Sequence, residues 1–297
     1  MSALAVVVLG YNSGREILDC IASVRHQGPS EIVVVDNAST DGSVEMVAQR
    51  FPDVRIVRNA TNRGFAAAAN QGVRETTAGY VLLINPDATA SPGALEALAS
   101  RLDAEPNAAA VGALVRNPDG SVQPTKRAFP SLAAAAMHAL IGPLWSNNPG
   151  TRAYVLADAA FGAPRRVDWV SCTATVLRRS VFEAVGGFDE SFFFFVEDVD
   201  LCRRLTRAGY EIWFEPEAEV VHIWGGAWTR RPIRFIWMHQ ANVFRYVRKH
   251  YRGGWVAAYP LIAAALFGRF VLLAARWLIT GRSVPGHREV AHGEETS

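Results

Sequence analysis

The segment LLINPDA at residues 82–88 decides the fold that we expect, because a run of apolar residues stops there at Asn85, Pro86 and Asp87. A short continuous apolar run bounded by turn residues is typical of a strand that is buried on both faces of a sheet. Asp87 would then lie just past the C-terminal end of that strand. Ligands bind at this edge in open α/β sheets. The segment therefore predicts an α/β fold with a ligand site beside Asp87.

Strand-like runs also precede this segment, and stretches of helical periodicity separate them. The opening residues lack the basic start of a leader, so we expect them to form the first strand. Strands that alternate with helices of about ten residues predict right-handed βαβ units and a parallel sheet. The expected strands are residues 4–9, 31–35, 54–57 and 80–84, with helices that include 43–50 and 65–77.

The regular alternation ends near residue 115. Residues 116–166 are rich in Pro, Gly, Asn and Ala, which predicts loops with one helix. Residues 167–177 have strand-like composition. A helix is expected from Asp198 to Ala208, where the following glycine would end it, and residues 210–214 are expected to form another strand.

A second acidic cluster stands in FFFFVEDVD at residues 192–200, where the expected helix begins. Acids are favoured in a first helical turn by the macrodipole alone, so a structural role is also compatible with this position. The four phenylalanines would form an apolar wall that raises a carboxylate pKa and makes the group a better base. Glu197 and Asp198 are therefore candidates for proton transfer, whereas Asp200 is expected to pair with Arg204 one turn later.

Three further residues are candidates for binding a nucleotide or a metal. Asp36 ends the second expected strand, where its carboxylate would accept the imide N–H of uracil or thymine, although the residues after it suit a turn and a helix cap equally well. Asp87 is a candidate ligand for Mg²⁺ or Mn²⁺, since at a diphosphate such an ion needs only one or two carboxylates. His222 precedes two glycines that would let the backbone approach phosphate, but a lone histidine is often structural.

The C-terminal part of the chain is basic and apolar. Between Trp228 and Arg252 there are seven Arg or Lys and no Asp or Glu, although the whole chain has a net charge of only +2. A basic block with interleaved aromatic residues suits phosphate or an anionic surface. Residues 255–279 are largely apolar, but Arg269 and Arg276 fall on one helical face, and each charge at mid-span costs roughly 2.5–3.5 kcal/mol. We expect a helix lying in the membrane interface, or alternatively one packed on its own domain.

Composition and spacing exclude several classes of protein. With 297 residues, 50% of them hydrophobic, the chain is long enough for a full core. Its three cysteines lack C-x-x-C spacing, which favours buried, unpaired thiols in a reducing compartment. The turn from Gly10 to Gly14 does not fit the G-x-G-x-x-G of dinucleotide-dependent oxidoreductases. A glycoside hydrolase would need two carboxylates that flank one bond but no nucleotide site. Asp36 at a strand end and the parallel βαβ units at the start of the chain argue against that class. A non-catalytic protein that binds a sugar nucleotide or a membrane stays open.

Taken together, six motifs resemble the family 2 inverting glycosyltransferases, which have the GT-A fold. The resemblance runs from Val6 to about Trp228. Within the family, the sequences NPD (85–87) and FFFFVEDVDLCRR (192–204) most resemble the bacterial rhamnosyltransferase branch. The motifs, in the order of the family, are VVVLGYNS (6–13), VVVDNASTDGS (33–43), NRGFAAAANQG (62–72), LLINPDA (82–88), the block from GGFDES to RAGYE (186–211) and VVHIWGG (220–226).

The resemblance implies a Rossmann-like, mixed but mainly parallel sheet with helices on both faces, followed by a helical extension. It implies a catalytic domain at 1–228, with a nucleotide-sugar-binding half at 1–115 and an acceptor half at 116–228. Residues 229–281 would form the membrane-associating extension, and residues 282–297 a disordered tail.

Roles for single residues also follow from the resemblance. Tyr11 and Asp36 would hold the nucleoside, and Arg63 would contact the nucleotide phosphates or the loop near them. Asp87 would ligate Mg²⁺ or Mn²⁺, with His222 as a second ligand. Asn85 departs from the family, since many members carry D-x-D here, and the lost negative charge implies weaker metal binding.

In the same way, Asp198 would be the general base, supported by Glu197. The branch implies transfer of L-rhamnose from dTDP-L-rhamnose to GlcNAc-diphospho-polyprenol, in building the linker between peptidoglycan and arabinogalactan. The enzyme would be peripheral at the cytoplasmic face of the plasma membrane and would have no nucleic-acid partner. Transfer of galactofuranose, glucose or mannose to a polyprenyl-linked or polysaccharide acceptor is the alternative. The sequence leaves the oligomeric state open, because the apolar C-terminal segment would also suit a dimer interface.

Overall fold

The computed structural model of the protein describes residues 3–129, 134, 137, 145, 147–156, 161–223 and 232–280. Two compact units divide the chain: residues 1–127, 160–193 and 197–226 form the first, and residues 128–159, 194–196 and 227–297 form the second. The expected tail at 282–297, the glycines after His222 and the expected domain boundary at 228 lie outside the described residues.

A mixed sheet forms the frame of the first unit. Its strands follow the order β3-β2-β1-β4-β11-β6-β12-β5, with β7 beside β6 and β9 beside β12. The neighbours from β3 to β4 run parallel, as do β6 and β12, while β11 is antiparallel to both β4 and β6. The strands are β1 (Leu4–Gly10), β2 (Glu31–Asp36), β3 (Arg55–Arg58), β4 (Tyr80–Ile84), β5 (Ala88–Ala90), β6 (Ala108–Arg116), β7 (Val122–Gln123), β9 (Arg165–Val167), β11 (Ala174–Arg178) and β12 (Glu211–His222).

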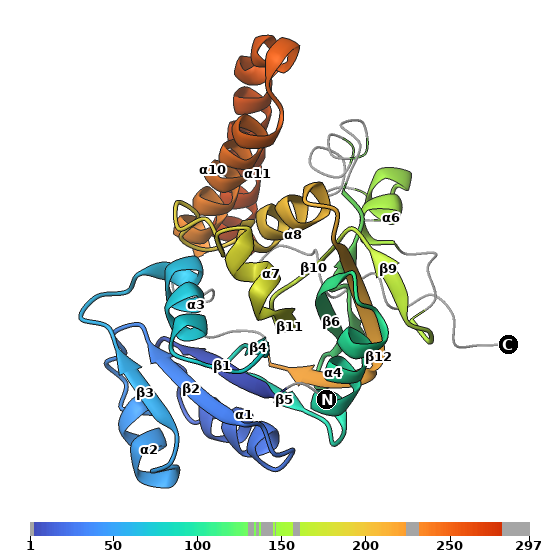
Figure 1. Ribbon diagram of the computed structural model, residues 1–297. Helices are drawn as coiled ribbons and strands as arrows, with labels where there is room; N and C mark the ends of the chain where they lie inside the picture. The colour runs from blue at the N-terminus through green and yellow to red at the C-terminus, as the bar shows by residue number, and fades with distance from the viewer. Residues whose placement is uncertain are drawn as a thin grey trace, which may run out of the picture. The chain divides into compact units, whose positions relative to one another are not determined.

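Helices cover both faces of this sheet (Figure 1). One face carries α1 (Glu16–Arg25), α2 (Ser43–Arg50) and α4 (Ala94–Ala104), and the other carries α3 (Gly64–Arg74) and α7 (Arg179–Ala184). Val6 and Val8 point into a core shared with α1, α2 and α4. Val7 points the other way, so close to α3 that a Cβ on Gly72 would lie 2.3 Å from its side chain. This alternation along β1 confirms the expected α/β architecture.

The second half of the sheet departs from the expected strands in two places. Residues 167–177 do not form one strand, because the chain changes partners: β9 pairs with β12, β10 (Trp169–Val170) pairs with β8 (Lys126–Arg127), and β11 joins β4 and β6. The strand expected at 210–214 continues as β12 to His222, with a register shift between Glu215 and Glu219. Local composition does not reveal this continuation, since Pro216 interrupts the apolar pattern.

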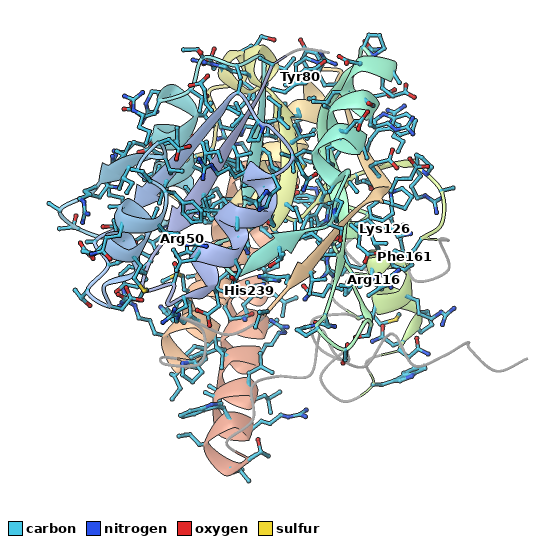
Figure 2. All side chains as sticks on the ribbon, turned by 90° about the horizontal axis from the view of Figure 1, so that it is seen from below. Arg50, Tyr80, Arg116, Lys126, Phe161 and His239 are labelled. Atoms are coloured by element: carbon cyan, nitrogen blue, oxygen red, sulfur yellow. The ribbon has the colours of Figure 1, made fainter. Side chains whose placement is uncertain are left out.

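Buried polar and sulfur-bearing side chains mark the interior of the first unit. The three cysteines are buried free thiols, as expected. Lys126 is fully buried, with its Nζ 3.9 Å from the ring centroid of Phe161 and 5.3 Å from that of Phe214 (Figure 2). Burial lowers the pKa of Lys126 to about 8. The aromatic faces supply the stabilisation that water would otherwise give this cation.

Most of the described residues of the second unit are helical. Its helices are α6 (Pro149–Val155), α10 (Pro232–His250) and α11 (Tyr259–Thr280), with the 3₁₀ helix η2 (Gly253–Ala258) between the last two. Asn148 caps α6 by accepting the Thr151 N–H at 2.9 Å, and proline follows at the first helical position. The apolar residues at 255–279 thus form the end of the short 3₁₀ helix η2 and most of the 22-residue helix α11.

Candidate active site

The carboxyl ends of β1 and β2 carry the expected nucleoside residues Tyr11 and Asp36. Gly10 pairs with Asp36 in register, so the two loops that follow leave the sheet side by side. Asp36 is buried, and its Oδ1 accepts the Ser39 N–H at 2.9 Å. The Tyr11 side chain is 42% exposed. The turn therefore uses one oxygen of Asp36, and the role of this residue toward a base stays a prediction.

The loop before α3 is tied to the same edge of the sheet. Asn37 donates from its side chain to the Gly64 carbonyl oxygen at 3.0 Å, and its Oδ1 accepts from Asn59 at 3.0 Å. Arg63 contacts Gln71 Oε1 at 3.3 Å through Nη1. Its side chain is 40% exposed and its Nη2 lies 3.9 Å from Glu190 Oε2, so that the group is accessible from solution. Its contact with a nucleotide stays a prediction.

Helix α3 also holds the segment that leads to the second acidic cluster. Asn70 is buried and binds the Phe188 backbone twice, donating to its carbonyl oxygen at 2.9 Å and accepting its N–H at 2.8 Å. The Phe65 N–H donates to the Phe193 carbonyl oxygen at 2.7 Å. Gly64 has a φ of +81°, and a Cβ there would lie 2.3 Å from that same oxygen. Glycine is needed at this position for both reasons.

The candidate metal ligands come together at the end of β4. His222 Nε2 lies 3.1 Å from Asp87 Oδ1 and 3.3 Å from Asn85 Nδ2. Strand pairing explains this convergence, because β12 runs antiparallel to β5 and places His222 opposite Ala88. Asp87 is 25% exposed at its side chain, whereas that of His222 is 7% exposed. The structure thus groups Asn85 and Asp87 with His222, which lies 135 positions after Asp87 in the sequence.

The donor atoms of this group fit a divalent cation. Adjacent ligands of an octahedral ion with bonds of 2.0–2.1 Å lie about 3 Å apart, and Asp87 Oδ1 and His222 Nε2 are separated by 3.1 Å. Among the residues that the structure describes, no group of three or more His, Cys, Asp or Glu side chains suits a metal. An ion at this position would therefore take most of its ligands from phosphate oxygens and water.

The second acidic cluster opens helix α8 (Glu197–Arg207), as expected. Burial raises the pKa of Asp198 to about 6, although hydrogen bonds from the backbone N–H groups of Val199 and Cys172, and the charge of Arg127, act in the opposite direction. Burial, followed by repulsion from Asp198, raises the pKa of Glu197 well above its usual range. A neutral Glu197 beside an ionised Asp198 is the charge state that these environments favour near neutral pH.

Glu197 has an unusual environment for a carboxyl group. Its side chain is buried, and its Oε2 has no hydrogen-bond partner among the residues that the structure describes. An ionised oxygen without a partner would be strongly destabilising. Asp200, by contrast, is fully buried and pairs with Arg204 at 2.8 Å, as expected for a structural ion pair.

One short segment connects the two acidic clusters. The Thr173 carbonyl oxygen accepts the Asn85 N–H at 2.9 Å, and the Cys172 N–H is hydrogen-bonded to the Asp198 carboxylate. Arg127 approaches from β8, where its guanidinium lies 5.4 Å from the ring centroid of Trp169. The adjacent residues Cys172 and Thr173 therefore connect Asp198 and the Asp87 turn through one stretch of backbone.

The turn before α8 belongs to the second unit and is strained. Phe195 and Val196 have φ values of +73° and +72°, a region that non-glycine residues rarely adopt and that is especially costly for β-branched valine. Asn242 of α10 holds this turn, because its side-chain amide donates to the carbonyl oxygens of Phe194 at 2.8 Å and Phe195 at 3.3 Å. Such strain is typical of segments that position functional groups.

Several residues of this site were not identified from the sequence. Gln123 and Arg127 lie in a stretch expected to be loops, and Thr173 in one expected to be a strand; none of them has a sequence signal of its own. Asn37 and Asn70 do stand inside two of the six motifs, and an asparagine in an otherwise apolar helix such as α3 is a signal that could have been used.

Similarity to known proteins shows the family to which the chain belongs. The sequence model described as Glycosyl transferase family 2 matches residues 5–185. Solved structures with the same fold include the mannosyltransferase PcManGT from Pyrobaculum calidifontis in complex with GDP-Man and Mn²⁺, with a TM-score of 0.57, 20% identity and coverage of 94% of this chain and 79% of the other. GalNAc-T7 with UDP, GalNAc and Mn²⁺ has a TM-score of 0.58 and 14% identity, over 96% of this chain and 59% of the other.

The protein is thus a glycosyltransferase with the GT-A fold, and it belongs to glycosyl transferase family 2. Among its relatives is the N-acetylglucosaminyl-diphospho-decaprenol L-rhamnosyltransferase of Mycobacterium tuberculosis, which is 36% identical over 86% of this chain and 87% of the relative. The pre-mycofactocin glycosyltransferase of the same species is 30% identical over 74% of this chain and 42% of the relative. The expected membership of family 2 is confirmed.

Proposed function

We propose that the protein transfers L-rhamnose from dTDP-L-rhamnose to GlcNAc-diphospho-polyprenol, with inversion at the anomeric carbon, in cell-wall linker biosynthesis. The observation that carries the proposal is the 36% identity to the mycobacterial rhamnosyltransferase, which extends over nearly the full length of both chains. That length includes residues beyond 185, where the match to the family model stops. The likeness to this relative therefore reaches the part of the chain that would distinguish acceptors.

Asp198 acts as the general base in the proposed reaction. Its carboxylate takes the proton of the acceptor hydroxyl while that oxygen attacks the anomeric carbon, and the bond to the nucleoside diphosphate breaks in the same step. A single displacement of this kind inverts the anomeric configuration. A pKa of about 6 suits the role, because the group is largely ionised at neutral pH yet more basic than an ordinary aspartate. Neutral Glu197 keeps a second negative charge away from the base.

Asp87 and His222 bind Mg²⁺ or Mn²⁺ in this proposal, supported by the 3.1 Å separation of their donor atoms. The bound ion supplies positive charge to the diphosphate leaving group. Tyr11 and Asp36 hold the nucleoside at the ends of β1 and β2, and Arg63 contacts the phosphates. Residues 1–228 form the catalytic domain, whose two halves meet near residue 115.

Residues 229–281 attach the enzyme to the cytoplasmic face of the plasma membrane, where a polyprenyl-linked acceptor is found. Among the described residues, the stretch Gly253–Thr280 has the length and mean hydropathy, 1.9, of a helix able to cross a membrane. Only 11% of the most apolar 18-residue segment of this stretch is buried. The exposed residues of α11 before Thr280 all lack a polar side chain and recur every three or four positions: Pro260, Leu261, Ala264, Phe267, Gly268, Val271, Leu272, Ala275, Leu278 and Ile279.

The arginines of α11 do not interrupt this apolar face. Arg269 Nη1 donates to Gln240 Oε1 of α10 at 3.0 Å, so its guanidinium turns inward within the hairpin. Arg276 is half-buried. Exposed Arg245, Arg248 and Arg252 add positive charge where α10 ends, each worth about 1 kcal/mol at an anionic surface. The combination favours a hairpin that lies in the membrane interface.

A donor panel tests the proposed function. The purified enzyme is assayed with dTDP-L-rhamnose and with nucleotide-activated galactofuranose, glucose and mannose, using a short-chain GlcNAc-diphospho-polyprenol and either Mg²⁺ or EDTA. We expect product from dTDP-L-rhamnose alone and none in EDTA. Turnover with another donor would replace the proposed sugar. Donor binding without turnover on an acceptor screen would identify a non-catalytic binding protein.

A further inference from the structure

Gln123, at the end of β7, is a buried glutamine whose side chain contacts the candidate metal ligand His222 twice. It is 2% exposed. Its Nε2 donates to the backbone carbonyl oxygen of His222 at 3.1 Å and to Asn117 Oδ1 at 2.8 Å. Its Oε1 lies 3.1 Å from His222 Nδ1. The glutamine therefore contacts both the backbone and the ring of one residue.

These contacts determine which atom of the Gln123 amide faces the imidazole. A backbone carbonyl oxygen only accepts hydrogen bonds, so the atom of Gln123 next to the His222 carbonyl must be the NH₂ group. The amide oxygen must then face Nδ1, and an oxygen of this kind only accepts. Nδ1 must therefore carry a hydrogen, which in a neutral imidazole leaves the lone pair on Nε2.

The position of this lone pair matters because Nε2 faces Asp87 Oδ1 at 3.1 Å. In the opposite tautomer an Nε2–H would donate to Asp87, and the two groups would satisfy each other without a metal. With the lone pair on Nε2, the nitrogen and the carboxylate oxygen 3.1 Å away are both acceptors, and the Asn85 amide, with its Nδ2 3.3 Å from Nε2, is the donor within reach of that lone pair. Histidines that bind metals commonly have their other nitrogen held in this way by an oxygen acceptor.

We propose that Gln123 is a positioning residue that holds His222 in its Nδ1–H tautomer, and so makes Nε2 available to a divalent cation together with Asp87. The inference rests on the proposed function of Asp87 and His222 as metal ligands. It adds a residue that touches neither the ion nor the substrates, and that acts only through the His222 ring.

Metal affinity tests the proposal without an activity assay. Binding of Mn²⁺ in the presence of saturating dTDP is followed by the electron paramagnetic resonance signal of the free ion. Gln123→Met keeps the size of the side chain but removes the acceptor for Nδ1–H, and we expect Mn²⁺ to bind about 10–100-fold more weakly. Gln123→Glu keeps an oxygen at Nδ1 and should lose less affinity than Gln123→Met.

The matched control is Gln240→Met in α10. Gln240 is 3% exposed and also uses both its amide nitrogen and its oxygen in side-chain hydrogen bonds. The Gln240→Met variant therefore reports the effect of losing any buried, hydrogen-bonded glutamine. Its Mn²⁺ affinity should match that of the wild type. Equal weakening by Gln240→Met and Gln123→Met would overturn the specific role of Gln123.

The tautomer itself is measured on the wild-type protein by ¹⁵N NMR of labelled histidines, with His222→Gln to assign the signal. This experiment needs no Gln123 variant to fold. We expect the signal of a nonprotonated nitrogen from Nε2 in the neutral ring. A lone pair on Nδ1 would overturn the inference while leaving the proposed reaction intact. If the wild type binds no Mn²⁺ with dTDP, the metal role of Asp87 and His222 fails, and the inference fails with it.

Discussion

The backbone N–H of Asn85 donates to the carbonyl oxygen of Thr173 at 2.9 Å, where β4 ends and the antiparallel strand β11 is about to begin. The residue before Thr173 is hydrogen-bonded to Asp198 through its own N–H. Two adjacent backbone residues, Cys172 and Thr173, are thus hydrogen-bonded to the two clusters. One bond goes to the turn that carries the candidate metal ligand Asp87, and the other goes to the candidate base.

Asp198→Asn should lower kcat by about 10²–10⁴-fold, because an amide cannot take the proton from the hydroxyl group of the sugar acceptor. Binding of dTDP-L-rhamnose should persist, since Asp198 acts on the acceptor. Turnover is measured by product formation and donor binding by calorimetry. Asp53→Asn is the control, as Asp53 is a half-exposed aspartate that pairs with Arg25 at the surface. Near-wild-type turnover of Asp198→Asn would remove this residue as the base.

The activity should depend on pH through the same carboxylate. The base must be ionised, and burial raises the pKa of Asp198 to about 6. We therefore expect kcat/KM to fall tenfold for each pH unit below about 6 and to be level above pH 7. The profile is measured in overlapping buffers at constant ionic strength. A profile that stays level down to pH 4.5 would contradict a base with this pKa.

Asp198 should also destabilise the folded protein at neutral pH. The folded-state pKa of about 6 exceeds the ordinary value of 3.8, so the native state holds a proton that the unfolded chain has already lost. Stability is therefore lost as the pH rises from about 4 to about 6, and the loss is complete above that range. Asp198→Asn should raise Tm at pH 7.5, and the gain should shrink at pH 4.5. An equal Tm difference at both values would contradict the assignment.

Asp87→Ala should weaken Mn²⁺ binding in the presence of dTDP and lower turnover, because the charged ligand of the proposed ion is lost. Asn85→Asp is the complementary variant, since it introduces the second acidic residue that many family members carry at this position. We expect it to bind Mn²⁺ more tightly than the wild type. Electron paramagnetic resonance of free Mn²⁺ measures both variants. Unchanged affinity in Asp87→Ala would place the ion elsewhere.

Gly64→Ala should disturb the support of the second acidic cluster. A Cβ at this position would lie 2.3 Å from the Phe193 carbonyl oxygen, and the backbone has a φ of +81°. Gly120→Ala is the control: its φ is +84°, but a Cβ there meets no atom within 4 Å. The control should cost about 1–2 kcal/mol for the left-handed backbone alone. Gly64→Ala should cost about 1–3 kcal/mol more, because the close contact must be relieved.

Denaturant unfolding measures this difference in stability, and turnover is assayed on the folded fraction of each variant. Because Phe193 precedes the acids of α8 by a few residues, Gly64→Ala should also lower kcat, whereas Gly120→Ala should not. Equal free energies of unfolding for the two variants would show that the approach of Gly64 to Phe193 contributes no constraint.

Leu272→Glu should release the protein from membranes. Leu272 is 63% exposed at the centre of the apolar face of α11, and a charged residue there opposes insertion into the interface. Trp145→Glu is the control, because Trp145 is 56% exposed outside this helix. Both proteins are sedimented with anionic vesicles. Continued sedimentation of Leu272→Glu with the vesicles would contradict membrane binding through this face. A dimer interface would then be the alternative, and analytical ultracentrifugation of the wild type would test it.

Much of the first half of the sheet was predictable because its signals are local. The strand bounds at Leu4–Gly10 and Glu31–Asp36 and the helix at Ser43–Arg50 agree closely with expectation. In each case an apolar run or a 3.6-residue period lies next to turn residues, and neighbouring elements pack on one another. The site residues that follow such elements, Asp36 and Asp87, were visible for the same reason.

Local sequence signals were enough to place Asp36 at the end of a strand, Asp87 just after one and Glu197 at the start of a helix, because these backbone features depend on neighbours along the chain. The approach of His222 to Asp87, by contrast, depends on long-range strand pairing, since β12 continues past its register shift and pairs with β5. The tertiary structure also decided that Arg269 would turn toward Gln240, leaving an apolar face. Helical periodicity places residues on a common face, but the packing partner, contributed by a distant part of the chain, determines which face is buried.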